Sequence, residues 1–169
     1  MPAQILRPWR DNERALRMEA VILMGIQGSG KTTFYLQRFL ETHVRISLDL
    51  VKTRGREQAL LETCLRTGQR FVVDNTNVRA QVRASYIAPA KSAGFRVIGY
   101  FFETPLPEAL RRNRLRSGRA VIPVPGLIGT LKRLERPSIE EGFDELYVVT
   151  HGEQDEFVVT RAAPTPVDV

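Results

Sequence analysis

Gly25–Thr32 reads GIQGSGKT, a glycine followed by four residues and then Gly-Lys-Thr. An apolar run, Ala20–Met24, precedes it, and a stretch with a helical pattern, Thr33–Thr42, follows it. This strand–loop–helix setting is the one that a phosphate-binding P-loop needs, because the glycines let consecutive backbone N–H groups point at an anion. The helix adds the positive end of its dipole. The stretch therefore predicts a nucleotide-binding site.

The side chains of this loop have separate expected roles. We expect Lys31 to reach the β- and γ-phosphates and the Thr32 hydroxyl to bind Mg²⁺. The full set of nucleotide-binding residues that the motif predicts is Gly25, Gln27, Gly28, Ser29, Gly30, Lys31, Thr32 and Thr33. A dinucleotide-binding loop is the alternative, but Thr33 stands at its third glycine position and Lys31 has no role in such a site.

The composition is that of an ordinary globular protein. The chain has 169 residues, 43% of them apolar and 26% charged, which predicts a single domain over residues 1–169. It has one cysteine and no apolar run of membrane-spanning length, so we expect a cytoplasmic protein without membrane contact. The net charge is +6, and it is unevenly distributed. Residues 1–134 contain 23 Lys/Arg and 10 Asp/Glu, whereas residues 135–169 contain 2 Lys/Arg and 9 Asp/Glu. A basic body suits an anionic substrate.

Apolar runs alternate with helical patterns along the whole chain. The predicted strands are 20–24, 44–48, 71–73, 95–102 and 146–150, and the predicted helices are 33–42, 57–67, 78–93, 107–116 and 125–134. This alternation predicts an α/β P-loop kinase fold, with about five parallel strands in the order 2-3-1-4-5 and helices on both faces. We also expect an N-terminal extension over 1–19 with a short polar helix at 11–19, an Arg-rich lid over 111–124, and a flexible tail over 162–169.

Two carboxylates follow strands that should end at the same edge of the sheet. Asp49 follows the second strand, where it could orient an acceptor hydroxyl and take up its proton. Asp74 ends the third strand, where it is expected to hold Mg²⁺ together with Thr32. The structural alternatives are a helix cap for Asp49 and turn formation for Asn75 and Asn77.

Five arginines lie between residues 111 and 119, with no acid among them. Arg112 and Arg116 are four residues apart and would share one helical face, where like charges repel unless an anion is present. A triphosphate supplies that anion, and a guanidinium is well shaped to hold it. The alternative is a solvated basic face that touches nucleic acid. The predicted catalytic set is Lys31, Asp49, Arg112 and Arg116.

Together these segments resemble the kinase module of the polynucleotide 5′-hydroxyl kinases. The matching segments are the P-loop Gly25–Phe34, the acceptor motif Asp49–Lys52, the third-strand motif Val72–Asn77, the lid Arg111–Pro123, and the Glu135–Pro137 and Glu141–Phe143 ending. The likeness runs in order from Val21 to Val149 and so covers most of the chain. Lys52 stands where that family typically has arginine, so bidentate phosphate geometry is lost there.

The resemblance implies ATP as donor, Mg²⁺ as metal, and Asp49 as general base toward a 5′-OH end of DNA or RNA. It implies that Arg112 and Arg116 contact the donor phosphates or the adenine. The residues expected to contact the acceptor, most of them on charge alone, are Asp49, Lys52, Arg54, Asn77, Arg79 and Arg83. The rivals are a kinase of a small-molecule hydroxyl (a sugar, nucleoside or antibiotic) and an ATPase switch. The expected partners are nucleic acid ends as substrate. A separate phosphatase or ligase in an end-healing pathway, and a homo-oligomer, are left open.

Overall fold

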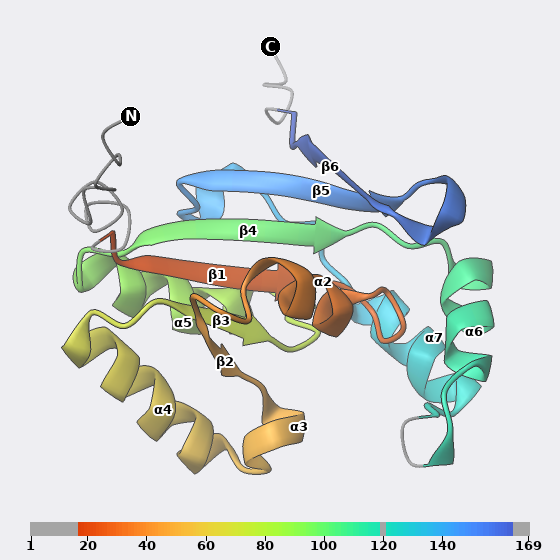
Figure 1. The fold of residues 1–169 in the computed structure, drawn as a ribbon, viewed down its shortest axis with the longest axis horizontal. Helices are drawn as coiled ribbons and strands as arrows, with labels where there is room; N and C mark the ends of the chain where they lie inside the picture. The colour runs from red at the N-terminus through yellow and green to blue at the C-terminus, as the bar shows by residue number, and fades with distance from the viewer. Residues whose placement is uncertain (1–16, 119–120, 164–169) are drawn as a thin grey trace, which may run out of the picture.

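A central sheet with helices on both faces makes up the computed structural model, which describes residues 17–118 and 121–163 (Figure 1). The strands are β1 Glu19–Met24, β2 Val44–Ile46, β3 Phe71–Asp74, β4 Arg96–Phe102, β5 Glu145–His151 and β6 Phe157–Arg161. The helices are α2 Lys31–Arg38, α3 Leu48–Val51, α4 Arg54–Thr67, α5 Ala80–Ser92, α6 Leu106–Arg114 and α7 Val124–Arg133, with short 3-10 turns η2 Ile139–Glu141 and η3 Glu153–Asp155.

The strand order is β2-β3-β1-β4-β5-β6. The first five strands are parallel and follow the predicted order, which confirms the P-loop kinase fold. The expected strand count of five was one too low, because β6 pairs with β5 in antiparallel orientation. The turn that leads into β6 carries Gln154 and Asp155 at positive φ (61° and 62°) instead of the Asn-Gly or Asp-Gly signal of a hairpin.

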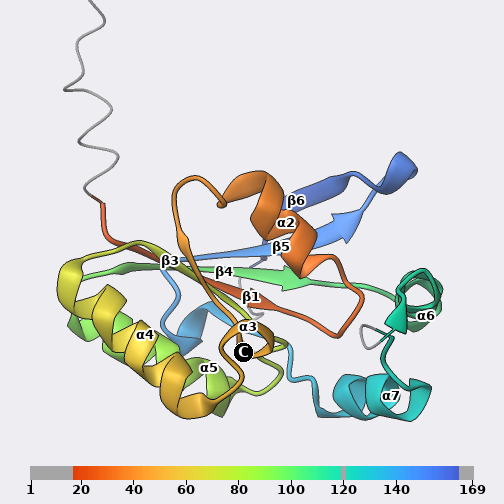
Figure 2. The same ribbon diagram turned by 60° about the horizontal axis from the view of Figure 1, so that its bottom comes forward.

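The side chains of β1 alternate between two cores. Val21 and Leu23 pack with Phe34 of α2 on one face, whereas Ile22 and Met24 face the cluster formed with α4 and α5 on the other. Figure 2 shows α2 on one side of the sheet and α4 and α5 on the opposite side. Because both faces are covered, β1 reads as a continuous apolar run.

A third, smaller core joins the P-loop to helices α6 and α7. Ile26 of the loop packs with Ala109 of α6 and Leu127 of α7, and all three are fully buried. Both helices lie beyond the carboxyl end of β1 (Figures 1 and 2). Asn113 of α6 binds the backbone of Ile122, just before α7. Its side chain accepts a hydrogen bond from Ile122 N at 2.9 Å and donates one to Ile122 O at 2.6 Å.

Some expectations change in detail or lie beyond the described part of the chain. The second strand ends at Ile46, two residues earlier than expected, and Leu48–Val51 forms the helical turn α3. Residues 11–16 of the expected N-terminal helix, residues 119–120 of the lid, and residues 164–169 of the tail are outside the described residues. Among the helices of residues 17–118 and 121–163, none has the length and hydropathy to cross a bilayer.

Candidate active site

The P-loop has the backbone geometry of an anion cradle. Gly28 and Gly30 have φ of 78° and 91°, a region that favours glycine, and α2 begins directly after them at Lys31. A Cβ at Gly28 would lie 3.1 Å from the carbonyl oxygen of Ala109 in α6, and one at Gly30 would lie 3.0 Å from the ring of Phe157. No acidic residue lies in the first turn of α2, so its positive dipole end is available to phosphate.

Lys31 is bound to its own loop. Its Nζ donates to the carbonyl oxygens of Gly25 and Ile26, each at 2.8 Å, and to Ser29 Oγ at 3.3 Å. Burial lowers the pKa of Lys31 to about 8, with a smaller contribution in the same direction from the Arg116 charge and opposing ones from Asp74 and Asp49. An anion in the cradle would favour the charged form, so this lysine is suited to bind phosphate.

Thr32 and Asp74 lie side by side at the ends of α2 and β3. The Thr32 hydroxyl donates to Asp74 Oδ2 at 2.9 Å. Arg45 of β2 also reaches this carboxylate, with Nε donating to Oδ2 at 2.8 Å, and its Nη2 lies 3.2 Å from Thr32 Oγ1. A hydroxyl and a carboxylate beside a phosphate cradle are hard oxygen donors of the kind Mg²⁺ prefers, so these two residues fit the metal.

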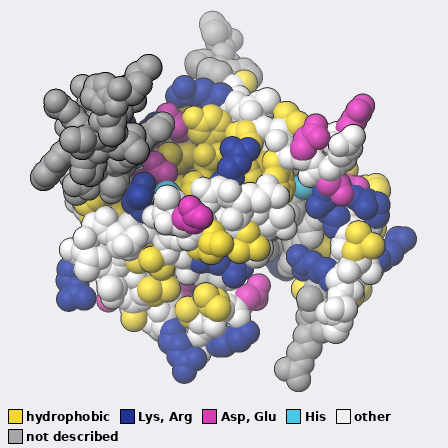
Figure 3. Space-filling view, viewed as in Figure 1, with side chains coloured by type: hydrophobic (Ala, Val, Ile, Leu, Met, Phe, Trp, Pro, Cys, Tyr) yellow, Lys and Arg dark blue, Asp and Glu magenta, His cyan; other side chains and the backbone are white. Residues whose placement is uncertain are grey.

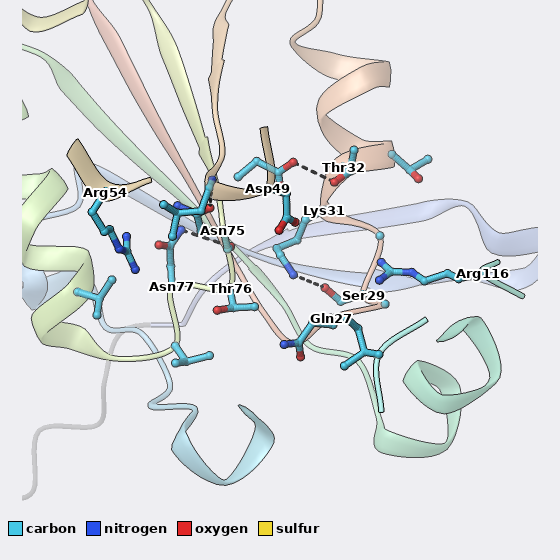
Figure 4. A pocket seen from close by; sticks show the side chains of 18 residues that line it. Gln27, Ser29, Lys31, Thr32, Asp49, Arg54, Asn75, Thr76, Asn77 and Arg116 are labelled. Carbon is cyan, nitrogen blue, oxygen red and sulfur yellow. Dashed lines mark hydrogen bonds between the residues drawn. The ribbon is translucent and has the colours of Figure 1, made fainter. Parts of the chain in front are cut away.

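These residues line a cavity of about 400 Å³ at the carboxyl edge of the sheet. Lys31 and Asp49 lie near its centre, and Arg54 and Arg116 lie on opposite sides of them (Figure 4). The complete lining comprises Gln27, Gly28, Ser29, Gly30, Lys31, Thr32, Thr33, Leu48, Asp49, Arg54, Asp74, Asn75, Thr76, Asn77, Val78, Val82, Arg116 and Ile122. Among the described residues, two buried oxygens of lining side chains, Gln27 Oε1 and Asn77 Oδ1, have no hydrogen-bond partner.

Asp49 sits in α3, which a buried hydrogen-bond network fixes in place. Asn75 Oδ1 accepts from Leu48 N at 2.9 Å, and Asn75 Nδ2 donates to Glu57 Oε2 at 2.9 Å. The Tyr86 hydroxyl donates to Glu57 Oε1 at 2.8 Å. The predicted turn role of Asn75 is thus only part of its contribution, because its side chain holds the helical turn that carries Asp49.

The two arginines of the predicted lid differ in position. Arg116 lines the cavity, whereas Arg112 does not. Arg112 donates to Glu108 Oε1 and Asp155 Oδ1, each at 2.8 Å, and its Nη2 lies 2.9 Å from His151 Nδ1. Hydrogen bonds from Arg111 and Arg112 lower the pKa of Glu108 to about 2. We expected a triphosphate to supply the anion for this pair of arginines, but Arg112 is already paired with acids from α6 and η3.

Three predicted acceptor contacts lie elsewhere. Arg83 is fully buried, with Nε and Nη2 each donating to a Glu141 carboxylate oxygen at 2.7 Å, so it cannot guide a strand, and that expectation was wrong. Lys52 and Arg79 are exposed but outside the cavity lining, where they end α3 and begin α5. Asn77, by contrast, lines the cavity and donates to Leu23 O at 2.7 Å.

Sequence reasoning missed Arg45 and His151. Arg45 interrupts an apolar strand and lies next to the predicted metal-binding carboxylate, and a charge inside a covered strand was the available signal. His151 Nε2 lies 2.9 Å from Ser29 O, which joins the end of β5 to the P-loop. No local pattern marks His151, because its partners lie 39 and 122 residues away.

Comparison with known proteins supports the fold. Residues 21–126 match the family described as an AAA domain. A gluconokinase from Sinorhizobium meliloti 1021 aligns with a TM-score of 0.58 and 17% identity, over 79% of this chain and 83% of its own. Kti12 from Chaetomium thermophilum, in complex with ADP-AlF3, aligns with a TM-score of 0.59 and 15% identity, over 81% of this chain and 90% of its own. The APS kinase CysC of Mycobacterium tuberculosis, in complex with AMPPNP and APS, aligns with a TM-score of 0.51 and 18% identity, over 79% of this chain and 88% of its own.

Proposed function

The chain belongs to the AAA domain family, and we propose that it is a phosphotransferase that moves the γ-phosphate of ATP to a hydroxyl acceptor. The observation that carries the proposal is the meeting of Lys31 in the P-loop with Asp49 in α3 across one cavity. A switch ATPase needs no carboxylate at an acceptor position, so this pairing favours transfer over simple hydrolysis.

The charged and polar residues at the centre of the cavity have roles that follow from their positions. The P-loop amides and Lys31 bind the donor phosphates, and Arg116 stabilises the charge that develops during transfer. Thr32 and Asp74 would hold Mg²⁺, which neutralises phosphate charge when bound. Asp49 orients the acceptor hydroxyl and takes its proton while the oxygen–phosphorus bond forms and the bond to ADP breaks. Asn75 keeps α3 in position for this step.

For the acceptor we propose a 5′-OH end of DNA or RNA. The motif order that resembles the polynucleotide 5′-hydroxyl kinases supports this choice, as does the basic charge of residues 1–134. The second candidate is a small-molecule hydroxyl, and the structural likeness to a gluconokinase favours it. The two candidates share the donor site and differ only in what lies beside Asp49.

A transfer assay distinguishes them. The protein is incubated with γ-labelled ATP and either 5′-OH oligonucleotides or a panel of sugars and nucleosides. We expect label on oligonucleotides, and label found only on small molecules would support the second candidate. Asp49→Asn should lower the transfer rate by about 10²–10⁴-fold while ATP binding, measured by calorimetry, is retained. A normal rate in this variant would show that Asp49 is not the base.

A further inference from the structure

A second cavity of about 530 Å³ opens next to the active site, between the N-terminal halves of α4 and α5. Its lining residues are Arg54, Gly55, Glu57, Gln58, Gln81, Val82, Ser85 and Tyr86. Arg54 and Val82 also line the active-site cavity, so the two spaces adjoin each other at these side chains. Each volume is within the range of a small-ligand site.

The floor of this groove is polar and internally satisfied. Glu57 is 5% exposed, and its carboxylate accepts bonds from Arg54 Nη1 at 2.9 Å, Tyr86 Oη at 2.8 Å and Asn75 Nδ2 at 2.9 Å. Burial and the bond to Glu57 raise the pKa of Tyr86 to about 12, which keeps its hydroxyl neutral. The floor therefore presents no unpaired negative charge to a ligand.

The walls and the mouth favour an anionic, hydrogen-bonding ligand. Gln58, Gln81 and Ser85 are exposed lining residues whose side-chain oxygens can accept from sugar and base edges, although Gln58 already donates to Glu62 and Ser85 to Val82 O. The exposed cations near the mouth on α3, α4 and the start of α5 are Lys52, Arg54, Arg56 and Arg79. Figure 3 shows Lys and Arg side chains gathered around α3 at the lower edge of this face. Along α4, the exposed acid nearest to the groove in sequence is Glu62, whose carboxylate accepts a hydrogen bond from Gln58 Nε2 at 3.0 Å.

We propose that this groove binds the nucleotides that follow the 5′ end of an acceptor strand. Arg54 would contact the first phosphodiester, because only its Nη1 is bonded to Glu57 and Tyr86 and its side chain stays 65% exposed, unlike that of Arg112. This proposal rests on the proposed kinase function. The 5′-OH would lie at Asp49, and the strand would leave the active site past Arg54 and Val82 into the groove. The exposed cations beside the groove are the groups that the phosphodiesters of a polymer would contact, whereas a single sugar has no such groups.

Gly55 is a lining residue at which a side chain can be added without a clash, so it offers a way to narrow the groove. A Cβ at this position would meet nothing within 4 Å, and the residue lies in the first turn of α4, so Gly55→Leu adds bulk in open space. The matched control is Ala84→Leu, which adds the same side chain at an exposed position of α5 that does not line the groove. Loss of a glycine from a helix also favours folding slightly.

The test compares a nucleoside 3′-monophosphate with a 5′-OH hexanucleotide in γ-labelled transfer. The wild type should have a KM about 10- to 100-fold lower for the hexanucleotide, as expected for several added polar contacts. Gly55→Leu should remove that advantage and leave kcat on the short acceptor unchanged, while Ala84→Leu should behave as the wild type. Fluorescence anisotropy of the labelled hexanucleotide should show the same loss of affinity without any turnover.

The possible failures can be told apart. Phosphorylation of both acceptors with equal KM, unchanged by Gly55→Leu, would overturn the groove assignment and leave the kinase function intact. No transfer to any nucleic acid, with transfer to a sugar, would overturn the acceptor class itself. If Gly55→Leu does not fold, Ser85→Leu serves instead, because Ser85 is an exposed residue that lines the groove and not the active-site cavity. It should raise KM for the hexanucleotide and leave KM for the short acceptor unchanged. An unchanged KM for the hexanucleotide in Ser85→Leu would count against the groove.

Discussion

The buried ion pair between Arg83 and Glu141 should be the most sensitive point of the fold outside the P-loop. Arg83 is 0% exposed, and its Nη1 also donates to the carbonyl oxygens of Asn77 at 3.0 Å, Val78 at 3.1 Å and Glu135 at 3.1 Å. Five hydrogen bonds therefore link α5 to the loop after β3 and to the segment before β5. Since Asn77 and Val78 line the active site, this arginine supports the cavity from behind.

Glu141→Gln removes the counter-charge while keeping the size of the side chain. The amide nitrogen cannot accept from Arg83, so a guanidinium would be left buried without an anion. Breaking a buried pair in this way costs about 3–5 kcal/mol of unfolding free energy. For a domain of this size about 2–4 °C of Tm is lost per kcal/mol, so the melting temperature should fall by about 6–20 °C.

Urea and thermal unfolding followed by circular dichroism would measure the change. Glu140→Gln is the matched control, because Glu140 is exposed in the same turn and glutamine keeps an oxygen that can accept from the Ser138 hydroxyl, so we expect a cost of about 0.5 kcal/mol or less. If Glu141→Gln lowers the unfolding free energy by less than about 1 kcal/mol, the pair is not structurally important. The interpretation of Arg83 as a brace instead of a strand contact would then be wrong.

Three further predictions concern the active site. The pKa of Lys31 is about 8 in the ligand-free protein, below its ordinary value, and bound phosphate should raise it. ATP binding at pH 8.5 should therefore take up protons, and binding enthalpies measured in buffers of different ionisation enthalpy would reveal this; zero uptake at pH 8.5 would contradict it. The affinity for ATP should fall as pH rises above 8. The ligand-free fold should instead gain stability between pH 8 and the pKa of Lys31 in the unfolded chain, because the unfolded chain binds the proton more tightly there. Arg45→Met should lower the Mg²⁺ concentration needed for half-maximal activity, because it removes a cation bonded to Asp74. If the variant needs more Mg²⁺ than the wild type, Arg45 instead orients the Asp74 carboxylate for the metal. Arg116→Ala should reduce kcat by about 10³-fold, whereas Arg112→Ala, whose side chain already pairs with Glu108 and Asp155, should reduce it by less than about tenfold. Equal losses in the two variants would show that Arg112 also reaches the substrate.

The sequence alone determined the sheet order and the edge at which the site lies. An apolar run followed by a glycine-rich loop and a helix has one common physical use, so residues 20–42 identified the P-loop. Because parallel strands end at one edge, Asp49 and Asp74 could be assigned to the same cavity, and the structure brings both into its lining.

Tertiary structure alone decided which charges are bound by other charges. Arg83 pairs with Glu141 across 58 positions, Arg112 with Asp155 across 43, and Arg45 with Asp74 across 29. Periodicity and motif spacing describe neighbours along the chain, so they cannot distinguish an arginine that faces a ligand from one that a distant carboxylate neutralises. The strand β6 was missed for a related reason, since it is an edge strand that depends on pairing with β5 and lacks a hairpin signal in its turn.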